Sequence, residues 1–391
     1  MSWNFLAPQV EGLAARQAHA DIPENSFERE IGRDGFYGAA THMYHRNPPT
    51  AWMSVSGPIC PRALNPAQVA TVTASPWDAT ALLGNAHLKM RYWRTVRAMD
   101  HLVRNADGDD LLFVHAGDGE FFCDYGHLSY RDGDYLVIPR GTMWRLEPES
   151  PTDLLMVEAT GGNYGLPDRG ILGRHAIFDP GVLDRPALDD RFRAQPTDGH
   201  WTVAVKRGGQ LGRIAYPFNP LDAMGWKGDL HPIRLNMADI RPVISARLHL
   251  PPSVRSTFVS QRFVVCTLVP RPLETDPGAI KLPFFHSNDD YDEVIFFHKG
   301  EMGSRGKVVG PGMMTFHPSG ITHGPHPEVL PFMHTHPAKS FENYSVMVDA
   351  LDNLEIEPLP AGTEVVGYAE TWRASIARAP DARTAALEPA R

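Results

Sequence analysis

An internal repeat constrains the fold of this chain more than any other feature. In the C-terminal half, Glu293 is followed seven positions later by a glycine, and a Gly-x5-Pro-x-Gly-x2-His pattern then ends at His323. In the N-terminal half, Asp110 is followed seven positions later by a glycine, and the same pattern ends in a tryptophan, Trp144. Because a recurring spacing of turn residues marks a recurring structural unit, the two halves are predicted to share one fold.

The residues between these turns predict short β-strands rich in β-branched and aromatic side chains. The candidate strands are residues 111–114, 119–126, 134–139, 262–269, 293–297 and 344–348. Glycine and Asp-Gly turns separate them, as in a compact antiparallel barrel or jelly roll. The predicted fold class is therefore all-β, with two such barrels.

Composition divides the chain into five parts. Residues 1–92, rich in proline, glycine and small residues, predict an irregular N-terminal segment that packs on the barrels. Residues 93–160 and 226–350 are the two β-rich copies. Residues 161–225 are predicted to be a connector in which prolines interrupt any long element, and residues 351–391 a C-terminal segment ending in a tail.

Charge and composition argue against several classes of function. A net charge of −9 over 391 residues, with no basic stripe, does not favour a nucleic-acid partner. The N-terminus does not resemble a signal peptide, and no apolar segment approaches the ~20 residues that span a bilayer, so no membrane partner is expected. Three widely spaced cysteines (Cys60, Cys123 and Cys266) argue against a disulfide framework and favour the cytoplasm.

The stretch from residue 283 to residue 327 carries the predicted chemistry. It supplies two imidazoles and one carboxylate from separate strands: His286, Glu293 and His323. Asn288 lies two residues after His286, so on a strand both point into the barrel, and Asn288 would support the ligands. Two histidines and one carboxylate with open coordination positions suit a non-haem Fe(II) oxygenase. The predicted cofactor is Fe(II).

The first copy keeps the same spacing with the ligand types removed. Asn105, Asp110 and Trp144 stand near or at the places of the histidine, glutamate and second histidine of the later copy. We therefore predict that one barrel keeps the site and the other keeps only the fold.

These motifs resemble those of the cupin superfamily, in which two barrels make a bicupin, and within it homogentisate 1,2-dioxygenase. The elements shared with that family are His286-Ser-Asn288 ahead of Glu293, His317 six residues before His323-Gly-Pro, Asn105-Ala-Asp-Gly-Asp in the N-terminal barrel and Trp226-Lys-Gly-Asp-Leu-His-Pro in the connector. The resemblance implies a bicupin with short helices, assembled as a homo-oligomer of trimers that pair into hexamers.

By this resemblance the iron ligands are His286, Glu293 and His323. The family has six positions from its first ligand histidine to its glutamate, whereas this chain has seven. The extra residue makes Asp292 an alternative ligand.

The resemblance also indicates a substrate site. Phe284-Phe285 and Met302 stand where the family has tyrosines that help hold the substrate. Arg305, on the turn beyond the glutamate strand, would suit a substrate carboxylate through a bidentate fork. Phe285, Met302, Arg305 and Asn288 are thus the predicted substrate-binding residues.

Two histidines are predicted to be catalytic. His249 falls where the family carries its acid/base histidine ahead of a proline-containing turn, and imidazole suits removal of a phenolic proton. His231 is the alternative for that role. His317 would orient a substrate oxygen or O2, or else cap the end of its strand.

The predicted function is Fe(II)-dependent ring cleavage of a hydroquinone-type aromatic acid, homogentisate or a relative, with O2. Three alternatives stay open: a gentisate- or salicylate-type bicupin dioxygenase, a non-catalytic bicupin binding protein, and a Zn- or Mn-dependent isomerase on the same fold.

Overall fold

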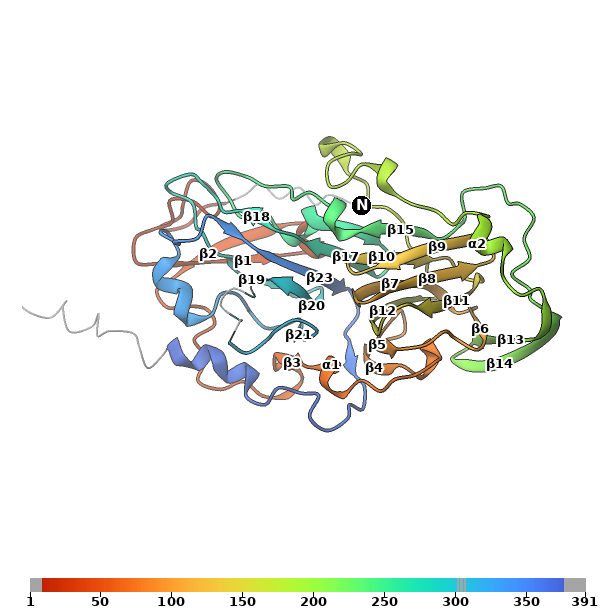
Figure 1. Cartoon of the computed structure of the whole chain (residues 1–391). Coiled ribbons are helices and arrows are strands. Elements are labelled where there is room, and N and C mark those ends of the chain that lie inside the picture. The colour runs from red at the N-terminus through yellow and green to blue at the C-terminus, as the bar shows by residue number, and fades with distance from the viewer. Residues whose placement is uncertain (1–8, 301, 303–304, 306, 376–391) are drawn as a thin grey trace, which may run out of the picture.

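Two β-barrels lie side by side and make up most of the molecule (Figure 1). The computed structural model describes residues 9–300, 302, 305 and 307–375, so the end of the predicted C-terminal tail lies outside the described residues. In this described part, no helix is long and apolar enough to cross a membrane. The all-β, two-barrel prediction is confirmed.

The N-terminal barrel consists of a seven-stranded and a six-stranded sheet, ordered β15-β10-β7-β12-β5-β4-β24 and β14-β13-β6-β11-β8-β9. The strands are β4 (Thr80–Gly84), β5 (Leu88–Thr95), β6 (Leu102–Asn105), β7 (Gly108–Ala116), β8 (Asp118–Cys123), β9 (Gly126–Arg131), β10 (Asp134–Ile138), β11 (Met143–Pro148), β12 (Thr152–Thr160), β13 (Asp198–Arg207), β14 (Gln210–Phe218), β15 (Ile233–Asn236) and β24 (Glu355–Ile356).

The C-terminal barrel has a six-stranded sheet, β16-β17-β23-β20-β21-β3, a three-stranded sheet, β19-β1-β2, and the pair β18-β22. The strands are β1 (Phe27–Gly32), β2 (Ala40–His45), β3 (Arg62–Leu64), β16 (Ser256–Val259), β17 (Phe263–Leu268), β18 (Arg271–Pro272), β19 (Phe285–Asn288), β20 (Asp292–Gly300), β21 (Met314–His317), β22 (Ser340–Phe341) and β23 (Asn343–Ala350).

Helices are short and lie at the rims. The α-helices are α1 (Pro66–Val69) and α2 (Asp190–Arg193), and the 3₁₀ helices are residues Asp34–Phe36, Gly57–Ile59, Pro76–Asp78, Gly170–Leu172, Pro180–Val182, Met237–Asp239, Pro252–Arg255, Pro327–Phe332 and Tyr368–Ser375.

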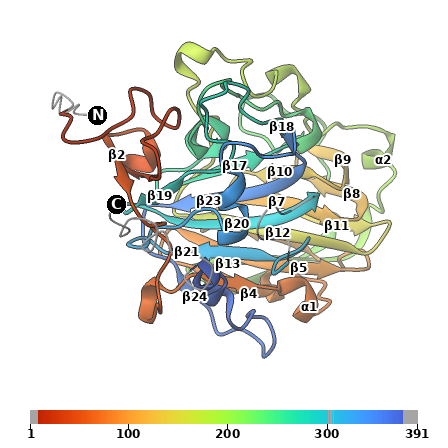
Figure 2. The ribbon, with the colours of Figure 1, turned by 90° about the vertical axis from the view of Figure 1, so that its left-hand side faces the viewer.

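The two ends of the chain cross between the barrels. Strands β1, β2 and β3 come from the N-terminal segment yet pair within the C-terminal barrel, with β1 parallel to β19 and β3 antiparallel to β21. In return, β24 from the C-terminal segment pairs with β4 of the N-terminal barrel. Figure 2 shows β24 beside β4, and it shows the N-terminal strand β2 on the same side of the molecule as β19, from which β1 separates it in the sheet.

The predicted connector contains a long hairpin that sequence reasoning missed. Strands β13 and β14 pair antiparallel, and β13 also pairs parallel with β6. Prolines break the chain on either side, but residues 198–216 contain none, and Gly208-Gly209 form the turn. The prediction of no long element between residues 161 and 225 was therefore wrong.

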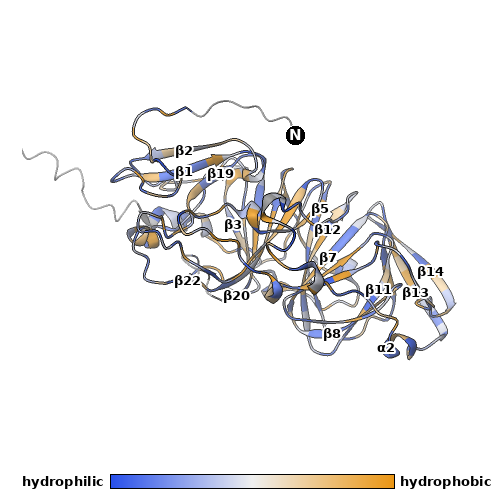
Figure 3. Cartoon of the chain, turned by 90° about the horizontal axis from the view of Figure 1, so that it is seen from above, coloured by the Kyte–Doolittle hydropathy of each residue, from blue (hydrophilic) through white to orange (hydrophobic). Residues whose placement is uncertain are grey.

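Side chains alternate between the barrel interiors and the contact between the barrels. Along β20, Ile295 and Phe297 belong to the interior cluster of the C-terminal barrel, whereas Val294 and Phe296 belong to a large cluster shared with Phe113 of the other barrel. This period of two is expected for strands covered on both faces. The two lobes seen from above in Figure 3 meet at this shared apolar layer.

A histidine pair marks the symmetry of that layer. His115 lies five residues after Asp110, and His298 lies five residues after Glu293. Their Nδ1 atoms are 3.1 Å apart. Equivalent residues of the two copies thus face each other across the contact between the barrels.

Backbone pairing aligns the two barrels residue by residue. His286 pairs with His323 in the C-terminal barrel, and Val103 pairs with Trp144 in the other. Trp144 therefore occupies the place of His323, as the repeat predicted, and Val103 occupies that of His286.

The place of Asn105 differs from the prediction. Asn105 ends β6 and precedes Asp110 by five residues, just as Asn288 ends β19 and precedes Glu293 by five. Asn105 is thus the counterpart of Asn288, two residues from the position predicted for it. Asn105 precedes Asp110 by five residues, whereas His286 precedes Glu293 by seven, so the two positions are not equivalent.

Candidate metal centre and cavity

Three predicted ligands converge inside the C-terminal barrel. His286 comes from β19, Glu293 from β20, and His323 from the turn after β21, whose backbone pairs with that of His286. The Nε2 atom of His323 lies 3.4 Å from Oε1 of Glu293, and that of His286 lies 3.8 Å from Oε2. The donor atoms of all three residues lie within 4.8 Å of one another.

The donor set fits a metal ion. Nδ1 of His286 is 2.9 Å from the carbonyl of Phe284, so this nitrogen carries the proton and donates it. Nε2 of His286 and Nε2 of His323 are buried and find no hydrogen-bond partner among the described residues. Buried polar atoms are rarely left unpaired, and a neutral imidazole with a fixed Nδ1–H offers a metal its Nε2 lone pair.

The electrostatics favour an ionised Glu293. Burial alone would raise the pKa of its carboxyl, but His323, His286 and His317 together hold that pKa well below its usual range. An anionic carboxylate in a buried site needs a cation close by. The three residues therefore present one negative charge and two lone pairs to a common point.

Asp292, the alternative ligand, faces the other way. Its two carboxylate oxygens accept hydrogen bonds from the backbone N–H groups of Ser319 and Leu354, each at 2.7 Å. Neighbouring residues on a strand point to opposite faces, so the side that presents Glu293 excludes Asp292.

His317 contacts the glutamate. It is fully buried and does not line the cavity described below. Its Nδ1 lies 2.7 Å from Oε1 of Glu293, and its Nε2 lies 3.1 Å from the hydroxyl of Tyr368. Burial, together with His323, lowers the pKa of His317 to about 3, so the ring is neutral. Sequence reasoning missed Tyr368, which lies outside the repeat.

A cavity of about 390 Å³ opens beside Glu293 and His286. This volume is near the low end for small-molecule sites, which suits a single ring with a short side chain. Of the predicted catalytic and substrate-binding residues, His249, Met302 and Arg305 line it.

Phe285, predicted to bind substrate, does not line the cavity, whereas Phe284 does. The ring of Phe285 packs edge-on against Phe27 of the N-terminal segment, with centroids 6.3 Å apart. Phe284 and His286 share one face of the chain and Phe285 the other, so strand alternation decides between the two phenylalanines.

His249 is buried at the cavity wall between opposite charges. Its Nδ1 lies 2.7 Å from the guanidinium of Arg271 and 3.3 Å from the carboxylate of Glu274. Burial and Arg271 lower the pKa of His249 to about 3, so the imidazole is neutral. The alternative, His231, packs against Trp226 with the two rings tilted by 42°, and it does not line the cavity.

Asn288 and Asp349 adjoin the candidate metal ligands in a small second cavity, which Pro252 also lines. One side-chain oxygen of each has no hydrogen-bond partner among the described residues. Burial and the neighbouring Glu293 raise the pKa of Asp349 well above its usual range. Sequence reasoning missed Asp349, which directly follows the predicted strand 344–348 and pairs opposite Glu293.

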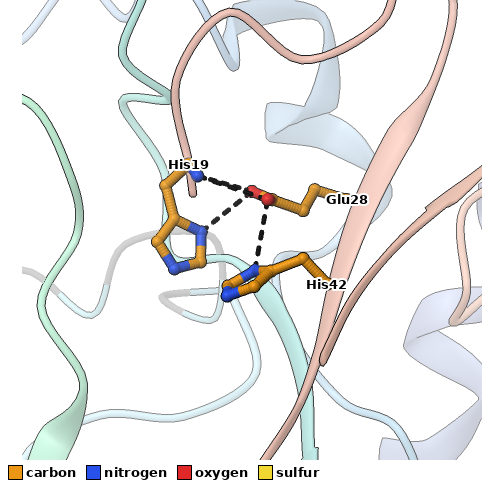
Figure 4. A group of neighbouring side chains, drawn as sticks. All are labelled: His19, Glu28 and His42. Atoms are coloured by element: carbon orange, nitrogen blue, oxygen red, sulfur yellow. Dashed lines mark hydrogen bonds and ion pairs between the residues drawn. The ribbon is translucent and has the colours of Figure 1, made fainter. Parts of the chain in front are cut away.

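A second His–Glu–His group lies in the N-terminal segment (Figure 4). Oε2 of Glu28 is 2.9 Å from Nδ1 of His19, Oε1 is 3.2 Å from Nδ1 of His42, and the backbone N–H of His19 also donates to Glu28 at 2.9 Å. The hydroxyl of Tyr44 is a further donor at 3.1 Å.

This second group is an ion-pair network rather than an open ligand set. Nε2 of His19 lies 3.1 Å from Glu30, so both ring nitrogens of His19 meet carboxylates. Burial alone would lower the pKa of His19, but Glu28 and Glu30 raise it to about 9. His19 is therefore an imidazolium, and its ring stacks on Phe284 with centroids 4.3 Å apart.

Comparison with known proteins places the chain among dioxygenase relatives. Residues 70–237 match the family described as homogentisate 1,2-dioxygenase N-terminal. The chain is 27% identical to "Putative dioxygenase SSO1533" of Saccharolobus solfataricus over 89% of this chain and 93% of that protein. It is 25% identical to homogentisate 1,2-dioxygenase of Bradyrhizobium diazoefficiens over 60% of this chain and 53% of that protein.

The chain spans about half the length of that homogentisate 1,2-dioxygenase. Among solved structures, a cupin 2 conserved barrel domain protein from Leptotrichia buccalis matches with a TM-score of 0.32 at 10% identity, over 74% of this chain and 96% of that chain. The strand pairing and the family match, rather than this superposition, support the assignment. The predicted resemblance is thereby confirmed: the chain has two β-barrels, and its sequence is similar to that of the homogentisate 1,2-dioxygenase family.

Proposed function

We propose that this protein is an Fe(II)-dependent dioxygenase that opens the ring of a hydroquinone-type aromatic acid, homogentisate or a relative. One observation carries the proposal: two unpartnered Nε2 atoms and an ionised glutamate converge beside a cavity of single-ring size. The match to dioxygenase relatives supports the same class of reaction.

In this proposal His286, Glu293 and His323 bind the metal. A ferrous ion in a site of two histidines and one carboxylate keeps open positions for substrate and O2 and supplies one-electron chemistry. His317 and Tyr368 keep the carboxylate in place through their chain of hydrogen bonds. Asn288 and Asp349 border the ligands on the side of the small cavity.

His249 is the proposed proton acceptor for a substrate phenol. Burial and Arg271 oppose protonation of this imidazole, whereas the Glu274 carboxylate, 3.3 Å from Nδ1, favours it. Phe284 and Met302 line the cavity and would contact the aromatic ring. Arg305, also at the cavity, adds a positive charge that favours an acidic substrate.

Oxygen uptake tests the proposal. Protein loaded with Fe(II) is mixed with a series of dihydroxylated aromatic acids, and O2 consumption is followed with an electrode. We expect uptake with at least one acid carrying para hydroxyl groups. Turnover that needs Zn or Mn and no O2 would instead identify an isomerase, and binding without any turnover would identify a binding protein.

A further inference from the structure

One wall of the cavity contains two buried arginines and only one adjacent buried carboxylate. Arg255 and Arg271 both line this wall, with only 8% and 7% of their surfaces exposed. The adjacent buried carboxylate, Glu274, is 3.1 Å from Arg271. The Arg271 guanidinium also lies over the ring of Phe341, 4.9 Å from its centroid. Arg271 thus has both an ion-pair partner and an aromatic partner within the protein.

The guanidinium of Arg255 has no such partner among the described residues. Among the described residues, no carboxylate, carbonyl or hydroxyl oxygen accepts a hydrogen bond from its guanidinium, nor does it form an ion pair. Burial and the like charge of Arg271 lower the pKa of Arg255 to about 10, which leaves it cationic at neutral pH. Burying an unpaired cation is costly, so such a residue implies a partner that the protein itself does not supply.

The backbone fixes where this cation lies. Arg255 ends the 3₁₀ helix Pro252–Arg255, and the hydroxyl of Tyr37 holds that helix by contacts of 3.0 Å with the carbonyl of Ser253 and with Oγ of Ser256. Pro252, at the start of the helix, lines both the main cavity and the small cavity at the metal ligands. The helix therefore forms part of the wall around the proposed substrate position.

We propose that Arg255 binds the carboxylate of the substrate and so selects aromatic compounds with an acidic side chain. A guanidinium fork pairs with a carboxylate through two parallel hydrogen bonds. Arg305, the residue that the sequence favoured for this role, is only partly buried and acts electrostatically on the proposed ligand His323 and on His317. The phenolic end of a ligand would point to Glu293 and its acidic end to Arg255. This inference deepens the proposed function and rests on it for the identity of the ligand as a substrate.

Binding without turnover tests the inference. Under anaerobic conditions, titration calorimetry measures the Kd of homogentisate and of its methyl ester, which lacks the negative charge. We expect the wild-type protein to bind the acid about 10- to 100-fold more tightly than the ester. In Arg255→Met the two should bind equally, and Arg255→Lys should keep part of the preference. Arg207→Met, a change of an exposed arginine on the far hairpin, should keep all of it.

The melting temperature without ligand separates a binding role from a structural one. Removing an unpaired buried cation should leave the melting temperature of Arg255→Met unchanged or higher. A lower melting temperature with the acid preference intact would mark Arg255 as structural and overturn the inference. Equal affinity for acid and ester in the wild type, or binding of neither, would overturn it as well.

The two proposals can fail separately. If no aromatic acid supports O2 uptake but the acid preference depends on Arg255, the proposed dioxygenase function fails and the anion site stands. If uptake is found but Arg255→Met keeps the acid preference, the function stands and the anion site fails.

Discussion

In the N-terminal barrel Lys206 reaches inward from β13, and its ammonium lies 2.5 Å from Glu158. In the C-terminal barrel the equivalent position on β1 is Gly32, which has no side chain: Gly32 pairs with Asn288 as Lys206 pairs with Asn105. One barrel therefore carries its own cation beside its buried carboxylates, whereas in the other the ring of Phe36 lies where a side chain at position 32 would begin.

Each barrel has two acidic residues at equivalent positions on neighbouring strands. Asp110 pairs opposite Glu158 in one barrel, and Glu293 pairs opposite Asp349 in the other. Lys206 and Arg91 hold the pKa of Glu158 below its usual range despite its burial. In the C-terminal barrel no such pair of cations is needed if a metal ion neutralises Glu293. In the N-terminal barrel a protein cation thus balances two buried acids, and in the C-terminal barrel a bound cation would do so.

The interiors of the two barrels also differ in how much empty space they contain. Trp144 and Val103 occupy the places of the two ligand histidines, and Trp144 packs with Trp93 and Phe121 to fill the N-terminal interior. The C-terminal interior has histidines at the same places and keeps a cavity. Apolar side chains at these two positions thus provide no metal-donor atoms and leave no cavity for a substrate.

The largest expected effect tests the carboxylate of the C-terminal barrel. Glu293→Gln removes the negative charge and should lower both metal retention and turnover by about two orders of magnitude or more, with the fold kept. Metal analysis and O2 uptake measure the two effects. Asp292→Asn is the matched control and should keep the metal. A Glu293→Gln protein that binds metal stoichiometrically would contradict the ligand assignment.

The next prediction tests the cation of the N-terminal barrel. Lys206→Met leaves two buried carboxylates beside each other and should cost about 3–5 kcal/mol of unfolding free energy, as for a broken buried ion pair. Urea denaturation measures it. Lys299→Met breaks an exposed pair with Asp132 and should cost no more than about 1 kcal/mol. Equal losses in the two variants would show that Lys206 does not neutralise the interior.

A third prediction concerns β1–β2, the hairpin that occupies the place of β13–β14. His19, which lies before this hairpin and contacts Glu28 and Glu30 of β1, has a pKa raised from 6.5 to about 9, so its stabilising effect is complete below about pH 6.5 and is lost as pH rises through 9. The pKa of Glu28 is lowered from 4.5 to about 2, so the pair also weakens as pH falls from 4.5 toward 2.

Wild type should therefore exceed His19→Gln in unfolding free energy by at most about 3 kcal/mol near pH 6, and by progressively less up to pH 9.5. Urea midpoints across this range measure the difference. His87→Gln changes a half-exposed histidine and should give a profile parallel to wild type. A difference that disappears on adding a chelator would instead indicate a metal at Glu28.

The smallest expected effect concerns the support of Glu293. Tyr368→Phe removes the hydroxyl that contacts His317 and should slow turnover about fivefold while metal is retained. Tyr130→Phe removes a similar contact, with Thr152, in the N-terminal barrel and should leave turnover unchanged. If both variants turn over at the wild-type rate, His317 needs no such support.

The repeat predicted the parts of the structure that depend on turn residues at fixed spacing. Both barrels and the meeting of His286, Glu293 and His323 follow from that spacing. Strand alternation, applied to the chain, also separates Glu293 from Asp292. It could have separated Phe284 from Phe285 in the same way, since His286 fixes which face is inward.

Features that depend on distant pairing were not predictable from the sequence. Arg255 and Arg271 become neighbours only through the fold, and the missing acceptor of Arg255 is a property of its surroundings. The meeting of His19 with Phe284 depends on a strand from the N-terminal segment pairing with β19. The role of His317 depends on Tyr368, which comes from the opposite end of the chain.

The crossing of the chain ends has a practical consequence for dissecting this protein. The ligand strand β19 has β1, residues 27–32, as its parallel partner, and β21 has β3, residues 62–64. An expressed fragment starting at residue 226 would expose two open sheet edges beside the metal ligands, and a fragment ending at residue 225 would lack β24. Neither half is a self-sufficient piece, so circular permutation or internal tagging is a sounder route to engineering than splitting the gene.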